Sequence, residues 1–384
     1  PLPSRSRAIQ RMTWAKHAQQ LRAQSPPYFR AKDIPHRLED TVNYMSIRSR
    51  NQVRTLFLAS SASTKNPSLH SFTPPPIRIV NDVDGDVTPP WEFHYSNVMW
   101  HHKHVPKPNR KDRVACNCIG ECGTDGSCAC LQLQRKWTKT WGIEDFAYTP
   151  NKRLINFMQP VFECNELCGC DETCRNRVVQ QGRRMALTLK KTKGKGWGVF
   201  NGPKKIKKGE FVGIYSGELL AEREAHRRGK KYNRFGRTYL FDLDFCAQAV
   251  ADEDAPDWEP LYTVDAYHAG NFTRFFNHGC DPNLKMVGVY VNEANLDKPF
   301  VAFFACRDIK PEEELTFNYR GSDDDDEDGG DSGEPSIIPS DEVYAKCLCG
   351  AWNCKGGCCV WVFQRRGQSR EMLTRSTGKM FNDK

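Results

Sequence analysis

Hydrophobic and polar positions change their spacing along the chain, and these changes divide it into regions. Near the N-terminus, apolar residues recur at three- and four-residue steps, which predicts a helix. These residues are Ala8, Met12, Ala15, Ala18 and Leu21. The following segment, SASTKNPSLHSFTPPP, has the Ser, Thr and Pro content of a linker. We therefore expect residues 1–76 to form an N-terminal accessory region with a linker.

A longer region, from about residue 183 to 320, alternates short apolar runs with Gly, Pro and Asn. The runs are GEFVGIYSGELL, RTYLFDLDF, KMVGVYVNE and KPFVAFFACRDI. Their β-branched and aromatic residues favour strands. Only residues 219–229 have the spacing of a helix. The pattern predicts a mostly β domain with some α structure.

Charge is distributed unevenly. The segment DDDDEDGGDSGE carries eight acidic residues, and the net charge of the whole chain is +9, so the remainder carries +17. We expect this basic body to have an anionic neighbour, with at most a weak nucleic-acid contact. Residues 321–342 should form an acidic flexible segment or a mobile lid.

The apolar runs and the first residues of the chain indicate whether it spans a membrane or carries a secretion signal. No run approaches the length of a membrane span, so we expect no membrane partner. The start, PLPSRSRAIQ, has no apolar segment typical of a secretion signal. Because the first residue is Pro1 rather than Met, we expect the natural chain to extend further upstream.

Seventeen cysteines are present, and thiols at very short spacings without a secretion signal indicate zinc ligands rather than disulfides. Nine of them lie between residues 116 and 174. Three tetrahedral zinc ions need twelve ligand positions, which nine thiolates fill if three of them bridge. Two separate four-cysteine sites with one spare thiol fit equally well. The nine are Cys116, Cys118, Cys122, Cys128, Cys130, Cys164, Cys168, Cys170 and Cys174.

A second, smaller cluster lies near the C-terminus. Cys347, Cys349 and Cys354 have the spacing C-x-C-x4-C, which is one ligand short of a tetrahedral site. The fourth ligand could be Cys358 or Cys359, or Cys280 in the distant stretch NHGCDPN. Sites made only of thiolates leave no open coordination position, so we expect both clusters to be structural.

Four motifs in this order, GKGWGVF, IYSGELL, RFFNHGCDPN and ELTFNY, precede the last cysteine cluster. Together with the nine-cysteine block, they resemble a SET-domain protein lysine methyltransferase of the suppressor-of-variegation class, and specifically the fungal heterochromatin type. The resemblance covers residues 77 to about 360. It implies a SET-domain β-fold with knot-like C-terminal threading, flanked by cysteine-rich zinc modules.

The domain limits follow from this resemblance and from the composition. We expect a pre-SET three-zinc module over residues 77–180, a SET catalytic domain over 181–320 and a post-SET module with one zinc over 343–361. Residues 362–384 would form a C-terminal tail.

The resemblance also assigns roles to individual residues. The cofactor S-adenosylmethionine would be bound by Lys195, Gly196, Trp197, Tyr239, Arg274, Asn277 and His278. The channel for the target lysine would be lined by Tyr215, Phe241, Phe317 and Tyr319, of which Tyr319 would orient the amine. Asp244 would meet a basic residue beside that lysine. The cofactor contact from the tail would fall to Trp361 or Trp352.

The implied function is methylation of lysine 9 on the histone H3 tail, within the nucleosome. Phe317 rather than Tyr leaves room for a methylated amine, which predicts di- and trimethylation. The implied location is nuclear chromatin, in heterochromatin and centromeric regions, with heterochromatin factors as partners. The alternatives are a zinc-stabilised chromatin-binding module with an inactive SET fold, and a methyltransferase for another lysine.

Overall fold

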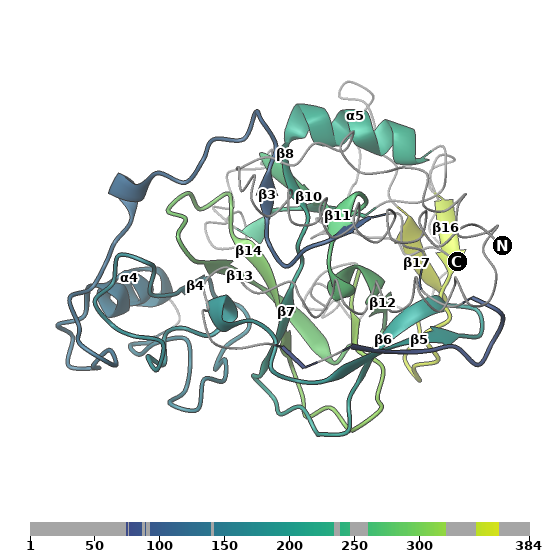
Figure 1. Ribbon diagram of the computed structural model, residues 1–384, viewed down its shortest axis with the longest axis horizontal. Helices are drawn as coiled ribbons and strands as arrows, with labels where there is room; N and C mark the ends of the chain where they lie inside the picture. The colour runs from purple at the N-terminus through teal and green to yellow at the C-terminus, as the bar shows by residue number, and fades with distance from the viewer. Residues whose placement is uncertain are drawn as a thin grey trace, which may run out of the picture.

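The computed structural model describes residues 74–75, 77–86, 89, 93–139, 142–233, 239–245, 260–319 and 343–360. The expected N-terminal helix, acidic segment and C-terminal tail fall outside these residues. Within the described part, strands predominate (Figure 1). None of the helices there is long and apolar enough to cross a membrane.

The described strands are mostly short. In chain order they are β1 (Ile77–Val80), β2 (His94–Tyr95), β3 (Trp100–His101), β4 (Val161–Phe162), β5 (Leu187–Thr192), β6 (Gly196–Asn201), β7 (Phe211–Ile214), β8 (Glu218–Ala221), β9 (Leu240–Asp242), β10 (Tyr262–Asp265), β11 (Ala269–Gly270), β12 (Asn277–His278), β13 (Leu284–Tyr290), β14 (Phe300–Ala305), β15 (Thr316–Phe317), β16 (Val343–Lys346) and β17 (Gly357–Val360). The α-helices are α4 (Ala129–Thr138) and α5 (Glu222–Asn233), and the 3-10 helices are η2 (Arg110–Asp112), η4 (Val179–Gln181) and η5 (Phe272–Phe275).

Two four-stranded sheets and one three-stranded sheet form the body. Their strand orders are β4-β13-β14-β7, β3-β8-β10-β9 and β1-β5-β6. Apolar side chains from all three sheets meet in one core, for example Phe303, Val264 and Leu189, each fully buried. The four apolar runs of the sequence contribute β7 and β8, β9, β13 and β14. The predicted mostly β fold is confirmed.

The predicted helix over residues 219–229 is partly wrong, because α5 begins only at Glu222 and residues 218–221 form strand β8. Leu219 and Leu220 are buried and pair with Val264 and Thr263 of β10. Although their spacing fits a helix, they form a strand, because pairing with β10 supplies backbone hydrogen bonds and buries both side chains. Acidic residues in its first turn then favour the helix from Glu222 onward.

Helix α4 was not predicted, because cysteines dominate the pattern of its region. It begins after Cys128 and buries one face that includes Leu131 and Gln134. Gln134 donates to the Pro160 carbonyl at 2.8 Å and accepts from the Phe162 amide at 2.9 Å. The helix therefore fastens the cysteine-rich block to β4.

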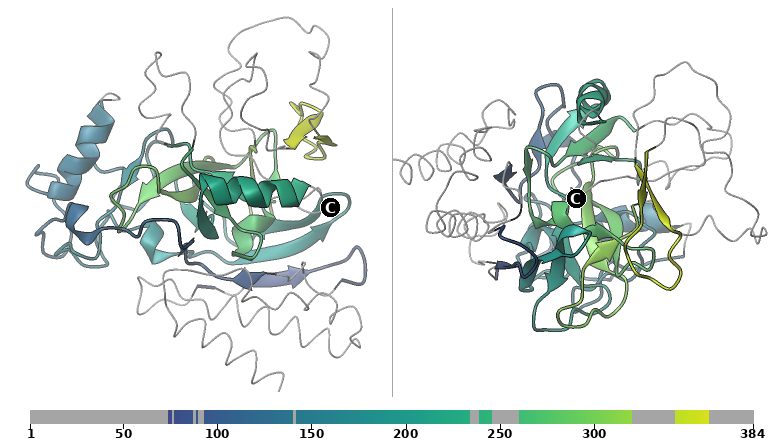
Figure 2. Two further views of the ribbon diagram at one scale, coloured as in Figure 1. Left: turned by 90° about the horizontal axis from the view of Figure 1, so that it is seen from above. Right: turned by 90° about the vertical axis from the view of Figure 1, so that its right-hand side faces the viewer.

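β4 in turn joins this block to the central sheets. It pairs in parallel with β13, and the rings of Phe162 and Tyr290 stack at 4.8 Å between centroids. The block around α4 and the hairpin β16–β17 lie at opposite ends of the body, as two perpendicular views show (Figures 1 and 2). The two cysteine modules thus flank the sheets that lie between them.

A buried ionic network attaches α5 to the sheet beneath it. The Arg228 guanidinium donates to Glu218 at 2.7 Å and to Asp265 at 2.8 Å, and the Tyr232 hydroxyl donates to Asp265 at 2.9 Å. Burial raises the pKa of Glu218 to about 7, with Asp265 adding repulsion, although Arg228 opposes the shift. Glu218 therefore lowers stability when it ionises in the folded protein.

Replacing Glu218 with Gln should change how stability depends on pH. The pKa of Glu218 is higher in the folded protein than in the unfolded chain, so ionisation of Glu218 disfavours folding. As pH rises from about 5 to 8, the free energy of unfolding of the wild-type protein should therefore fall by about 3 kcal/mol relative to that of Glu218→Gln. Urea unfolding across this range at constant zinc would measure the difference. The exposed Glu121→Gln variant is the control and should follow the wild type; identical pH profiles for all three proteins would contradict the prediction.

Candidate functional site

Two strands that are distant in sequence meet at the centre of the site. β12 pairs in parallel with β15, with Asn277 opposite Thr316 and His278 opposite Phe317. The amide of Gly279 extends this ladder by donating to the Phe317 carbonyl at 3.1 Å. The pairing brings the NHGC and TFNY stretches together, as the resemblance implied. Knot-like threading of the chain stays a prediction.

His278 connects the two halves of the site. Its Nδ1 accepts from the Tyr319 backbone amide at 3.1 Å, and its Nε2 lies 3.3 Å from the Cys280 sulfur. Because Nδ1 accepts, the ring proton belongs on Nε2, where it is donated to the sulfur. Both ring nitrogens are therefore occupied in holding the fold, so His278 is not placed as a general base.

The four predicted channel residues all lie in one buried aromatic cluster. The rings of Tyr215 and Phe241 are 5.6 Å apart, and those of Phe317 and Tyr319 are 4.8 Å apart. Each of these side chains is at most 5% exposed. Phe303 packs against Phe317 at 5.0 Å and closes the cluster toward the core.

Both tyrosine hydroxyls in this cluster are held by main-chain carbonyls. Tyr319 donates to the Phe276 carbonyl at 2.6 Å, and Tyr215 donates to the Tyr239 carbonyl at 2.9 Å. Burial raises the pKa of Tyr215 well above its ordinary value, so it stays protonated. With their protons directed at carbonyls, the two oxygens can only offer lone pairs to a neighbour.

Arg274 provides unused donors in the same region. It is fully buried, and its guanidinium lies between the rings of Phe93 and Tyr239, 4.0 Å from each centroid. Nε donates to the Ala266 carbonyl at 3.1 Å, but neither terminal nitrogen has a hydrogen-bond partner among the described residues. Buried guanidinium donors normally have acceptors, and a carboxylate suits this fork best. A ligand carboxylate would complete the pair.

The hairpin between β5 and β6 lies beside Asn277. Asn277 Nδ2 donates to Glu314 Oε1 at 2.8 Å, and the Lys195 ammonium pairs with the other Glu314 oxygen. A Cβ at Gly198 would lie 2.6 Å from Glu314 Oε1, so only glycine allows this approach. The predicted Lys195, Trp197 and Asn277 are thus brought together. A direct contact of Lys195 with the cofactor stays a prediction, because its ammonium is paired with Glu314.

Sequence reasoning missed two residues of this site. Glu314 is the first letter of the quoted ELTFNY motif, and its place in that motif was the available signal. Phe93 stacks on Arg274 from the segment WEFHY, far away in sequence. No local pattern distinguishes it from an ordinary core aromatic residue.

β9 forms one edge of its sheet, and Asp244 follows it. In the strand order β3-β8-β10-β9, the described residues place no strand on the outer side of β9. The Leu243 amide donates to the Tyr262 carbonyl at 2.9 Å and continues the ladder toward Asp244, which is partly exposed. Phe241 of the aromatic cluster belongs to this same strand. The edge and the cluster are therefore adjacent.

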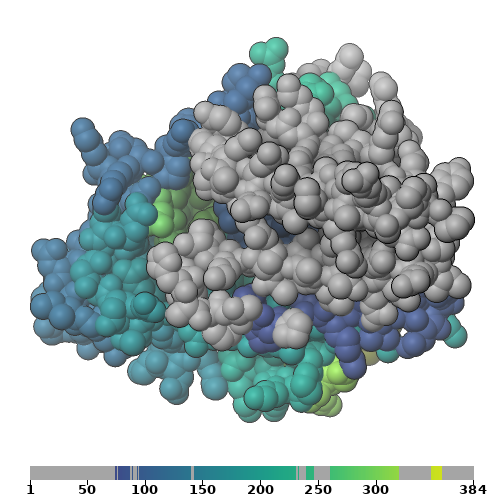
Figure 3. Space-filling model, in the orientation of Figure 1, coloured from purple at the N-terminus to yellow at the C-terminus, as the bar shows by residue number. Residues whose placement is uncertain are grey.

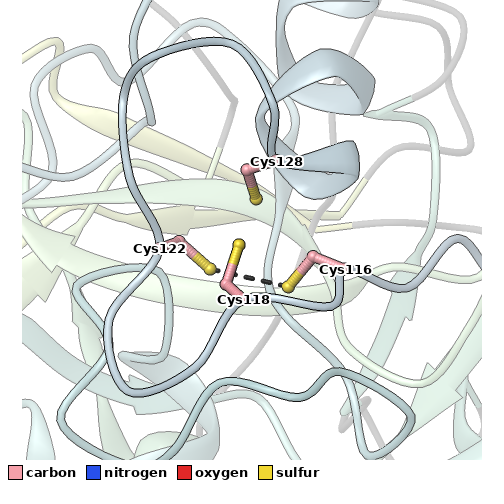
Figure 4. A group of neighbouring side chains, drawn as sticks. All are labelled: Cys116, Cys118, Cys122 and Cys128. Atoms are coloured by element: carbon pink, nitrogen blue, oxygen red, sulfur yellow. Dashed lines mark hydrogen bonds between the residues drawn. The ribbon is translucent and has the colours of Figure 1, made fainter.

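The nine cysteines of the N-terminal block form one compact group. Cys116, Cys118, Cys122 and Cys128 point toward a common centre (Figure 4). Two further sets overlap with the first, and within each set all sulfurs lie within 4.8 Å of one another. These sets are Cys116, Cys122, Cys164, Cys170 and Cys116, Cys130, Cys164, Cys168. Every pair of sets shares a cysteine, which contradicts two separate four-cysteine sites.

Cys174 completes the count. It lies in hydrogen-bonding range of Cys122, Cys164 and Cys170. If Cys174 replaces Cys116 in the second set, three cysteines belong to two sets each and so bridge two metal positions. These are Cys116, Cys122 and Cys164. The other six cysteines belong to one set each and are terminal ligands. Three tetrahedral zinc ions are then fully ligated. Apart from Leu131 and Phe146, this region's core consists of these cysteines and Ala129, so zinc coordination takes the place of an apolar core.

The fourth ligand of the C-terminal site is Cys280. Its sulfur and those of Cys347, Cys349 and Cys354 lie within 4.8 Å of one another, and the Cys280 and Cys347 sulfurs are 3.8 Å apart. The Asn353 side chain also donates to the Cys280 carbonyl at 3.3 Å. Of the three candidates proposed from the sequence, Cys280 is thus in place; the side chains of Cys358 and Cys359 lie outside the described part.

The tail aromatic residue that would cover the cofactor is not identified. Trp352 is 92% exposed, and Trp361 falls outside the described residues. The exposed indole of Trp352 packs on nothing in the site. A cofactor contact from the tail stays a prediction.

Metal content should follow the two clusters. The purified protein should hold four zinc ions, and Cys280→Ser should hold three, since three thiolates bind zinc more weakly than four. Inductively coupled plasma mass spectrometry would count them. Cys306→Ser is the matched control, because Cys306 belongs to neither cluster, and it should keep all four. Four zinc ions in Cys280→Ser would contradict the assignment.

Two family models match the chain. The SET domain matches residues 196–320, and the Pre-SET motif matches residues 70–177. The first covers most strands of the three sheets and the four predicted channel residues, and the second covers the nine cysteines. The order of the two modules agrees with the order inferred from the sequence.

Curated and solved proteins resemble the same part of the chain. "Histone-lysine N-methyltransferase, H3 lysine-9 specific" of Cryptococcus neoformans is 36% identical, over 73% of this chain and 18% of its own length. "Histone-lysine N-methyltransferase SUV39H1" of Xenopus laevis is 33% identical, over 84% of this chain and 72% of its own.

A solved structure of KRYPTONITE with mCHH DNA, an H3(1–15) peptide and SAH has a TM-score of 0.56 and 28% identity. It matches 78% of this chain and 54% of its own. For most of the curated relatives, this chain spans less than two thirds of their length.

Proposed function

Because the chain belongs to the family in which a Pre-SET motif precedes a SET domain, we propose that it is a protein-lysine N-methyltransferase. It transfers methyl groups from S-adenosylmethionine to lysine 9 of histone H3. The Cryptococcus neoformans relative is named as specific for H3 lysine 9, and the Xenopus laevis relative is named as a histone-lysine N-methyltransferase. The observation that carries the proposal is the buried aromatic cluster, in which two oriented tyrosine oxygens lie in the same core as Arg274.

The residues around Arg274 fit the cofactor. Its two unpartnered donors suit the carboxylate of the methionine moiety. Asn277 and the glycine-rich hairpin lie where the backbone approaches closely, as Gly198 shows. Trp197, 5% exposed, belongs to the same core cluster. When bound, S-adenosylmethionine supplies an electrophilic methyl group on a sulfonium.

The aromatic cluster can prepare a lysine amine for attack. Only roughly 0.4% of free lysine is neutral at pH 8. An apolar site beside a cation lowers the amine pKa through desolvation and repulsion. The chain therefore needs no dedicated base, in agreement with the occupied His278 nitrogens. The hydroxyl oxygens of Tyr319 and Tyr215 can accept hydrogen bonds from the N–H groups of the amine. The nitrogen lone pair of the amine then faces the methyl group.

The edge position of β9 in the described sheet suits the peptide substrate. A histone tail can add to this edge as a strand, which uses main-chain hydrogen bonds for affinity and side-chain contacts for specificity. Asp244 then meets a basic residue beside the target lysine. Phe241, in the same strand, places the lysine at the mouth of the aromatic cluster.

The same reasoning places the protein on chromatin. A histone H3 tail within a nucleosome as substrate implies a nuclear location. We propose that it acts in heterochromatin, including centromeric regions, with heterochromatin factors as partners. The fungal relative specific for H3 lysine 9 supports the choice of lysine.

Tyr319→Phe should lower methylation of an H3 tail peptide at least about 100-fold, because it removes the oxygen that orients the amine. A radiolabelled methyl assay would measure this. Tyr290→Phe is the matched control, since its hydroxyl also donates to a main-chain carbonyl, at 2.6 Å from Leu296, but outside the cluster. A wild-type protein without activity would favour the inactive chromatin-binding module, and methylation only on another lysine would reject the H3 lysine 9 assignment.

Phe317→Tyr should shift the product from di- and trimethyl-lysine toward monomethyl-lysine. The added hydroxyl occupies space next to Tyr319, 4.8 Å from ring to ring, and hinders rotation of a methylated amine. Mass spectrometry of product peptides would count the methyl groups. Phe300→Tyr, in another cluster, should leave the distribution unchanged. If the wild-type protein stops at one methyl group, the inference about space is wrong.

A further inference from the structure

The segment from residue 101 to 113, HHKHVPKPNRKDR, is a strongly basic stretch that the function above does not use. We call it the basic segment. It contains five Lys or Arg residues, three His residues and one acid, Asp112. It runs from β3 past η2 toward the cysteine-rich block (Figure 1). Residues in this part of the colour scale reach the surface at the upper left of Figure 3.

Four of its five cations are exposed, and three of these form no ion pair with a described carboxylate. Lys103, Lys107, Arg110 and Lys111 are all exposed. Among the described residues, no carboxylate forms an ion pair with Lys103, Arg110 or Lys111. The one local acid, Asp112, accepts from the Asn109 side chain at 2.8 Å. The charges of Lys103, Arg110 and Lys111 therefore face solvent, whereas Arg113 pairs with Glu166 at 2.8 Å.

Its backbone, by contrast, is fixed. Val105 is 5% exposed, and its amide donates to the His102 carbonyl at 2.9 Å. Lys298 donates to the Pro106 carbonyl at 2.9 Å, and the Asn109 side chain caps η2 by accepting from the Lys111 amide at 3.1 Å. A cationic row held in place loses less entropy on binding than a mobile one.

A second group of lysines, in contrast, forms ion pairs within the protein. Lys205 and Lys207 both pair with Asp308, at 2.6 and 3.3 Å. Two of the three exposed or half-exposed lysines there, Lys204, Lys205 and Lys207, thus share one acid. In the basic segment, by contrast, Lys103, Arg110 and Lys111 share no acid among the described residues.

We propose that the basic segment docks on the phosphate backbone of double-stranded DNA, and so holds the protein on the nucleosome that presents its substrate tail. The nine residues from Lys103 to Lys111 are joined by eight steps and span at most about 28 Å, the length of about eight base pairs at 3.4 Å per pair. The segment contains no Phe, Tyr or Trp to stack on unpaired bases. Its contacts would be sequence-independent phosphate contacts.

The nucleosomal part of this inference rests on the proposed function, but DNA binding can be tested separately. Lys103→Ala, Arg110→Ala and Lys111→Ala are combined in one zinc-loaded protein. Its affinity for a duplex of about 20 base pairs is measured between about 50 and 200 mM salt by fluorescence anisotropy. The slope of log Kd against log salt should fall by about three, since each lost phosphate contact removes about 0.9. Methylation of free H3 peptide should not change, while methylation of nucleosomes should fall several-fold.

The matched control combines Lys204→Ala, Lys205→Ala and Lys207→Ala, which removes the same charge. It should retain a larger share of the wild-type slope. Equal loss of duplex affinity in the two triple variants would overturn the proposal, and so would a wild-type salt slope in the basic-segment variant. It would also be overturned if the basic-segment variant lost affinity only for single-stranded RNA. If the wild-type protein does not methylate the H3 peptide, the proposed function is rejected. The duplex measurement then still tests whether the basic segment binds DNA.

Discussion

The parallel pairing of β12 with β15 is the contact on which the candidate site depends. It holds Asn277 and His278 against the TFNY stretch, and from there Tyr319 reaches back to the Phe276 carbonyl. His278 then links the Tyr319 amide to the Cys280 sulfur. If this ladder opened, the tyrosine, the amide of Asn277 and the fourth ligand of the tail zinc site would separate together.

Metal sites stabilise the parts of the chain that have little apolar core. The nine-cysteine block buries few apolar side chains besides its sulfurs, and structural zinc contributes on the order of 10 kcal/mol in small domains. The tail site acts at longer range, because Cys280 belongs to the central stretch and the other three ligands follow it by more than sixty residues. Metal binding there fixes the hairpin β16–β17 beside the site.

Sequence reasoning identified the strands, both cysteine clusters and the aromatic residues, because each has a local signal in spacing or motif. It could not choose between three bridged zinc ions and two separate sites, since that choice depends on which sulfurs meet in space. It placed the start of α5 three residues early, because Leu219 and Leu220 fit both a helix face and a buried strand. Phe93 and the pairing of Glu314 with Lys195 arise from tertiary contacts that no local pattern encodes.

An open sheet edge next to a binding site also carries a risk of self-association. Among the described strands none lies on the outer side of β9, and a strand from a second copy of the protein could add at such an edge. β9 is only three residues long, and Asp244 brings a negative charge just beyond its end. Two such edges placed together would bring like charges into proximity. The shortness of β9 and the charge of Asp244 therefore both oppose pairing between copies.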